Sequence, residues 1–82
     1  DEMRRFQDEQ GQEWTATMAR HEGMDYKGAF HLVMTPADGG APVELQDIRW
    51  NTERTAQRTL ETMSEVELRR RLRSARGRAP VA

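Results

Sequence analysis

Apolar side chains recur at every second position in several stretches of the first fifty residues. This period of two is typical of a strand that buries one face. The alternating positions are Trp14, Ala16 and Met18, then Phe30, Leu32 and Met34, then Val43 and Leu45. With a short first strand around Phe6, the pattern predicts a four-stranded antiparallel meander over residues 1–50.

Glycine and proline separate these stretches. Gly11 ends a polar segment and suits the positive φ of a hairpin loop. Pro36 ends the third stretch, because proline cannot donate to a ladder. Residues 21–28 and 37–42 contain further glycines and are expected to be loops.

The fourth strand breaks its own alternation. Ile48 and Trp50 have the opposite parity from Val43 and Leu45. A β-bulge near Gln46-Asp47 would return both pairs to one face.

After the fourth strand the apolar period becomes helical. Asn51 or Thr52 can cap a helix over residues 51–63. A spacing of i, i+4 and i+7 places three apolar side chains on one narrow stripe. These are Ala56, Leu60 and Met63.

A second helix is predicted over residues 64–77 from its N-terminal sequence. Ser64 and Glu67 have the spacing of a capping box, in which Ser64 accepts from the Glu67 amide and the glutamate reaches back. Met63 and Leu68 occupy the positions of a hydrophobic staple. The helix should stop at the glycine that closes this range, a favoured residue just past a helix end.

This second helix is amphipathic and rich in arginine. At 100° per residue, Leu68, Leu72 and Ala75 fall within a sector of about 60°. The residues after the helix, 78–82, lack a periodic pattern and are expected to be extended. The arginines on the opposite side are Arg69, Arg70, Arg73 and Arg76.

Charge is distributed unevenly along the chain, although the net charge is −1. Residues 1–68 hold all 14 acidic side chains and seven basic ones, whereas residues 69–82 hold six arginines and no acid. Only one of the 13 basic residues is lysine. A GC-rich genome, whose codons favour arginine, is the preferred explanation. The alternative is selection for bidentate anion contacts, which arginine makes and lysine does not. Glu65 with Arg69 and Glu67 with Arg71 form i,i+4 pairs in the favourable order.

Catalytic and cofactor motifs are missing from the sequence. There is no cysteine, and neither a P-loop nor a G-x-G-x-x-G pattern occurs. No apolar run is long enough to span a membrane. We therefore expect a protein that is not an enzyme and holds no cofactor.

Two groups of residues allow a chemical interpretation beside a structural one. His21, Glu22 and Asp25 share one loop, but they lack the spacing of a known metal site, so a solvated loop is the preferred interpretation. His31 lies between two inward-facing residues and is expected to be a half-exposed histidine on the other face of the sheet.

The aromatic residues suit either a stacking platform for single-stranded nucleic acid or a hydrophobic core. The acidic balance of this half favours the core for Trp14, Phe30 and Trp50.

The arginine-rich helix is the strongest candidate for partner binding. One interpretation is that this helix face is simply solvated. The other is that it binds an anionic partner, which could be a phosphate backbone, an anionic lipid or an acidic protein surface. The acidic sheet half argues against nucleic acid as the main partner. We assign partner binding to Arg69, Arg70, Arg73 and Arg76, with Tyr26 as an exposed aromatic in its loop.

Two segments carry a resemblance to a known group of proteins. Residues 50–56 (WNTERTA) and 63–72 (MSEVELRRRL) resemble a small membrane-extrinsic accessory subunit of bacterial photosynthetic reaction-centre and light-harvesting complexes. The resemblance implies a structural role without pigment or cofactor ligation.

The sequence thus predicts a single α+β domain over residues 1–82, a four-stranded antiparallel β-meander followed by two C-terminal helices. We expect a non-catalytic accessory subunit that docks on a larger protein assembly. Its expected location is cytoplasmic, at the inner-membrane face if that assembly is membrane-bound. The alternative is a small regulatory domain that binds nucleic acid through the arginine-rich helix.

Overall fold

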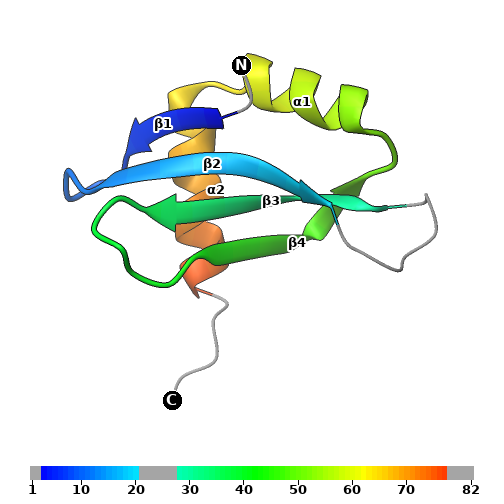
Figure 1. Cartoon of the computed structure of the whole chain (residues 1–82). Coiled ribbons are helices and arrows are strands. Elements are labelled where there is room, and N and C mark those ends of the chain that lie inside the picture. The colour runs from blue at the N-terminus through cyan, green and yellow to red at the C-terminus, as the bar shows by residue number, and fades with distance from the viewer. Residues whose placement is uncertain (1–2, 21–27, 78–82) are drawn as a thin grey trace.

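The computed structural model describes residues 3–20 and 28–77, and it has the predicted α+β architecture (Figure 1). Four strands form one antiparallel sheet in the order β1-β2-β3-β4, and two helices follow. The elements are β1 (Met3–Gln7), β2 (Glu13–Arg20), β3 (Phe30–Pro36), β4 (Val43–Trp50), α1 (Glu53–Thr62) and α2 (Glu65–Gly77).

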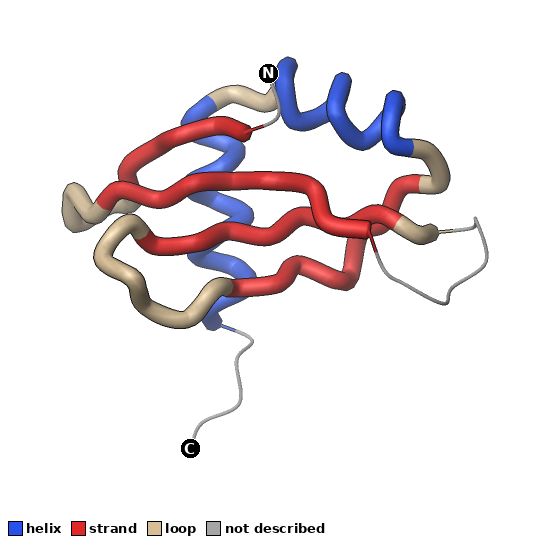
Figure 2. The backbone as a smooth tube through the Cα atoms, in the orientation of Figure 1, coloured by secondary structure: helices blue, strands red, loops and turns tan. Residues whose placement is uncertain are grey.

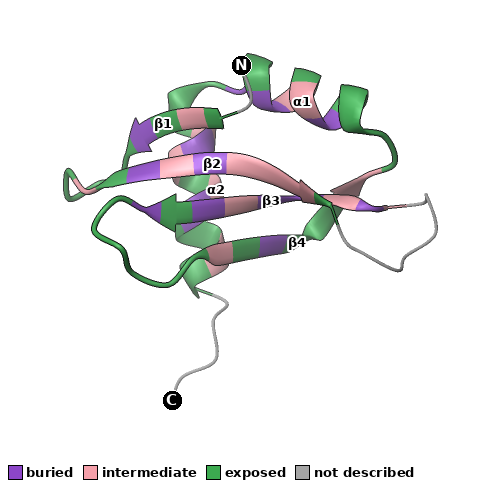
Figure 3. Ribbon diagram, viewed as in Figure 1, coloured by how far each residue is buried: buried purple, intermediate pink, exposed green. Residues whose placement is uncertain are grey.

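Both helices pack on the same face of the sheet. In Figures 1 and 2, α2 crosses behind the strands, whereas α1 lies at the top of the view, above the right-hand part of β2. Burial alternates along β2 and β3 as the period of two predicts (Figure 3). The buried cluster joins the inward faces of all four strands to both helices. Its members are Phe6, Trp14, Ala16, Leu32, Met34, Leu45, Leu60, Met63, Leu68 and Leu72.

The bulge in β4 lies where the change of parity predicted it. His31 pairs with Arg49, but the next residue, Leu32, pairs with Leu45. Residues 46–48 of β4 therefore have no opposite residue on β3. This insertion leaves Ile48 42% exposed beside the buried Leu45.

Both helix N-termini are capped by the predicted side chains. Thr52 Oγ1 accepts from the Thr55 amide at 3.2 Å, and Ser64 Oγ accepts from the Glu67 amide at 3.0 Å. Asn51, the other candidate cap, instead accepts from the Gly28 amide at 2.7 Å. That contact ties the start of α1 to the segment before β3.

The capping box of α2 is only half formed. The Glu67 carboxylate accepts from Arg71 Nε at 2.9 Å and lies 3.6 Å from Arg70. Among the described residues it does not accept from the Ser64 amide, so the predicted return bond is wrong. The two nearby guanidinium groups offer a stronger, charge-assisted interaction than a neutral amide does.

The C-terminus of α1 is bound by an arginine from the first strand. Arg4 donates to the carbonyl oxygens of Leu60 and Met63 at 2.8 Å each, and to that of Glu61 at 3.2 Å. The last turn of α1 contains no basic residue of its own. Arg4 therefore supplies the positive charge that a helix C-terminus favours.

His31 differs from its expected environment. It was expected to be half-exposed, but it is only 4% exposed. It lies between Ala19 and Arg49 in the register of the sheet, and its Nε2 is 3.2 Å from Glu44 Oε1. Because β3 is a central strand, residues of both neighbouring strands lie beside the ring. The alternation of apolar residues along β3 alone does not predict this burial.

Replacing Arg4 with alanine should remove the cap from α1 and expose three carbonyl groups. We expect the free energy of unfolding to fall by about 1–2 kcal/mol, measured by urea denaturation. Arg5→Ala is the matched control, because Arg5 is the exposed neighbour on the same strand. Equal losses in the two variants would contradict the capping role of Arg4.

Candidate partner-binding face

Arg69 holds α2 against the edge of the sheet. Its Nε donates to the Gln7 carbonyl oxygen at 2.9 Å. Glu65, one helical turn earlier, accepts from the Gln7 amide at 3.4 Å and lies 3.5 Å from Arg69. The predicted i,i+4 pair is thus confirmed, and together its two side chains bind both backbone polar groups of Gln7, a residue on an edge strand. Such contacts also cover an edge that could otherwise pair with another chain.

Arg73 and Arg76 contact the turn between β1 and β2. Arg73 Nη1 lies 2.7 Å from Glu9 Oε2, and Arg76 Nη1 lies 3.6 Å from Asp8 Oδ2. Arg76 also lies over the ring of Trp14, 5.4 Å from its centroid, within reach of a cation–π interaction. Exposed ion pairs add little stability individually, but these contacts set which way the arginines point.

Asp8 organises the turn that receives these arginines. Its Oδ1 accepts from the amides of Gln10 and Gln12 at 2.9 Å each, and its Oδ2 accepts from Trp14 Nε1 at 3.0 Å. Burial raises the pKa of Asp8, but these hydrogen bonds and the charge of Arg76 outweigh it. The pKa of this carboxyl therefore lies below its ordinary value of 3.8.

Arg70 is the least engaged arginine of α2. Its side chain is 64% exposed, and its contact with Glu67 is a long 3.6 Å. Arg71 is more buried and is bound to the same carboxylate at 2.9 Å, which confirms the second predicted i,i+4 pair. Glu67 is therefore the closer partner of Arg71, and the Arg70 guanidinium faces solvent.

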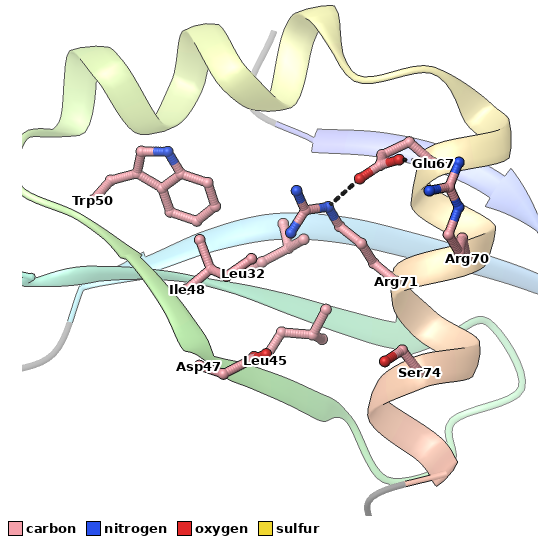
Figure 4. Close-up of a pocket in the computed structure, with 9 residues that line it drawn as sticks. All are labelled: Leu32, Leu45, Asp47, Ile48, Trp50, Glu67, Arg70, Arg71 and Ser74. Atoms are coloured by element: carbon pink, nitrogen blue, oxygen red, sulfur yellow. Dashed lines mark hydrogen bonds and ion pairs between the residues drawn. The ribbon is translucent and has the colours of Figure 1, made fainter.

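A cleft of about 250 Å³ lies between β4 and α2. Figure 4 shows Arg71 extending from α2 toward Trp50 and Ile48, with Glu67 bound behind it. The cleft has an apolar floor and a polar rim, which α2 forms together with Asp47 of β4. The floor is formed by Leu32, Leu45, Ile48 and Trp50, and the rim includes Asp47, Glu67, Arg70, Arg71 and Ser74.

A second hollow lies on the outer side of α2 and shares Arg70 with the cleft. It has a volume of about 270 Å³ and is lined by Glu9, Val66, Arg69, Arg70 and Arg73. Val66 is 61% exposed, which is unusual for a β-branched apolar side chain. We call the surface formed by Ile48, Trp50, Val66, Arg70 and Arg71 the α2–β4 face.

The structure separates the four arginines that the sequence grouped together. Arg69, Arg73 and Arg76 contact residues of the first hairpin, whereas the ion pair of Arg70 is with Glu67 of its own helix. Tyr26, the fifth predicted partner-binding residue, lies outside the described residues. The proposed metal group His21, Glu22 and Asp25 lies outside them too.

The apolar half of the α2–β4 face was missed by the sequence interpretation. Trp50 was assigned to the core; it packs against the core but is only half-buried and also lines the cleft. Trp14, in contrast, is a core residue as predicted, whereas Phe30, also assigned to the core, is only half-buried. The broken parity at Ile48 and Trp50 was the signal, since a bulge next to a helix leaves apolar side chains at a surface.

Within residues 3–20 and 28–77, no group of three or more histidine, aspartate or glutamate side chains is arranged to hold a metal ion.

Neither of the two described helices is both long and apolar enough to cross a membrane.

Comparisons with protein-family models, with curated proteins and with solved structures give no match for this chain.

The lowered pKa of Asp8 predicts a dependence of stability on pH. A carboxyl whose pKa is lower in the folded state adds stability above its unfolded pKa and loses that contribution as the pH falls through its folded pKa. We expect Asp8→Asn to flatten the loss of stability below about pH 4. Urea denaturation across this range measures the effect. Glu61→Gln, on the exposed side of α1, is the control, and its free energy of unfolding should depend on pH as that of the wild type does. The same pH dependence in all three proteins would refute the prediction.

Proposed function

We propose that this chain is a non-catalytic accessory subunit that docks on a larger protein assembly through the α2–β4 face. The observation that carries the proposal is the position of Arg70. This exposed cation borders two hollows, and each hollow contains an exposed apolar side chain, Ile48 in one and Val66 in the other. Apolar groups next to an exposed arginine are typical of protein interfaces.

The internal contacts of α2 favour a protein partner over a phosphate backbone. Nucleic-acid binding needs several cations that can each contact a phosphate. Arg73 and Arg76 lie beside Glu9 and Asp8, whose carboxylates would repel a phosphate placed there. Arg70 has one long ion pair, to Glu67 of its own helix, whereas Arg76 has an ion pair of the same length to Asp8 and also lies over the Trp14 ring.

The nature of the assembly is proposed from the sequence. The resemblance of residues 50–56 and 63–72 favours a membrane complex, specifically a photosynthetic reaction-centre complex, with this chain at its cytoplasmic side. Thr52 and Ser64 within these segments are helix caps, and Leu68 and Leu72 are core residues. Much of the resemblance therefore concerns residues that build the fold. The part of it on the α2–β4 face consists of Trp50, Val66, Arg70 and Arg71.

Charge reversal at Arg70 tests the proposed docking face. Tagged Arg70→Glu and wild-type chains would be purified natively from the source cells, with quantitative mass spectrometry of the intact complex. We expect the wild-type chain to elute at fixed stoichiometry in one assembly. The amount of assembly that elutes with Arg70→Glu should be at least roughly tenfold lower, since a like charge at a contact opposes binding. Reversal at Arg69 or Arg73 is less informative, because it would also break contacts with Gln7 and Glu9.

Arg54→Glu is the matched control. Arg54 is exposed on α1 and lines neither the cleft nor the second hollow, and the substitution changes the net charge by the same amount. Full retention of the assembly by Arg70→Glu would contradict the proposal. A steep fall in binding between about 50 and 200 mM salt, with nucleic acid in the complex, would instead support the regulatory alternative.

A further inference from the structure

The cleft between β4 and α2 is small and has an apolar floor and a polar rim that carries two arginines and two carboxylates, Glu67 on α2 and Asp47 on β4. Its floor is built by the β4 bulge, which turns Ile48 and Trp50 toward α2 (Figure 4). Pockets that hold drug-sized ligands or cofactors measure about 300–1,000 Å³. At about 250 Å³ the cleft is smaller than these and suits a single large side chain.

The two arginines at the rim of the cleft can receive a carboxylate. Arg71 binds Glu67 through its Nε, and among the described residues its two Nη atoms make no hydrogen bond. These atoms lie on the side of the cleft that faces Trp50 and Ile48 (Figure 4). Arg70 adds a second, more exposed guanidinium at the same rim. Guanidinium groups bind carboxylates in a planar, bidentate geometry.

We propose that the cleft is the anchor site for an acidic segment of the partner protein, which inserts one large apolar side chain and places its flanking carboxylates on Arg70 and Arg71. The inference rests on the proposed docking function and names the chemistry of the segment that is recognised. The apolar side chain covers Ile48 and Trp50 and removes them from water. The carboxylates meet the two cations at the rim, where Glu67 already neutralises part of the charge of Arg71.

The two tryptophans allow a test by NMR with an internal control. The Trp50 indole lines the cleft, whereas the Trp14 indole donates to Asp8 at the first hairpin. The ¹⁵N-labelled full chain would be titrated with the acetylated and amidated pentapeptide Glu-Glu-Phe-Glu-Glu. Matched peptides would carry alanine at the centre, or lysine in place of every glutamate.

We expect saturable shifts of the Trp50 indole signal while the Trp14 signal stays in place. The alanine-centred peptide should bind roughly tenfold or more weakly, because it lacks the buried ring. The lysine peptide should not bind, and Arg70→Gln should weaken binding of the acidic peptide several-fold, whereas Arg54→Gln should not. Both substitutions lie on exposed positions of helices, so the variants retain the fold.

Several results would overturn the anchor site. Equal binding of the phenylalanine and alanine peptides would show that no side chain enters the cleft. Equal binding of the lysine peptide, or Trp50 shifts caused only by phosphatidylserine vesicles, would remove the acidic protein segment as occupant. Trp50 shifts that depend on protein concentration without peptide would assign the cleft to a second copy of the chain.

The two proposals can fail separately. If the peptide binds the cleft but Arg70→Glu retains the assembly, the docking function is wrong and the anchor site stands. If Arg70→Glu releases the assembly but no peptide perturbs Trp50, the docking function stands and the anchor site is wrong.

Discussion

The rotation of α2 about its own axis determines both how the sheet is covered and which charges remain for a partner. Leu68 and Leu72 are fully buried against the sheet, and this burial is the main force that holds the helix in place. Hydrophobic packing is non-directional and by itself tolerates some rotation. The hydrogen bond from Arg69 to Gln7, with the contacts of Arg73 and Arg76, fixes the orientation.

This orientation changes the meaning of the charge asymmetry along the chain. The acidic first part and the basic C-terminal helix are far apart in sequence, yet the fold places Asp8 and Glu9 beside Arg76 and Arg73. Much of the apparent bipolar character is therefore neutralised within the molecule. What remains is a smaller and more specific surface around Arg70, in which the apolar side chains matter as much as the charge.

The features that the sequence patterns predicted correctly are set by residues that lie close together in the sequence. Alternation gave the strands, the change of parity gave the bulge in β4, and the spacing of Ser64 and Glu67 gave the start of α2. The apolar stripe of α2 was also correct, since Leu68 and Leu72 are buried. All these signals act over a few residues, where backbone geometry fixes which side chains can meet.

The features that could not be predicted depend on contacts between distant parts of the chain. Arg4 binds carbonyl groups 56 to 59 residues away, and Arg69 binds Gln7 across 62 residues. No periodicity in either segment indicates such pairs. The burial of His31 has the same origin, because it depends on residues from neighbouring strands. The sequence therefore placed the candidate site on α2, but its arginines could not be separated by their contacts before the helix was placed on the sheet.

The exchange of arginine Nε protons with water is the most direct test of how α2 is oriented. Arg69 and Arg71 each donate an Nε hydrogen bond at 2.9 Å, whereas Arg70 approaches Glu67 only through Nη2. Exchange measured by NMR on the ¹⁵N-labelled chain should be slow for Arg69 and Arg71 and fast for Arg70. Equal protection of all three, or protection of Arg70 alone, would contradict the orientation of α2 and the docking face derived from it.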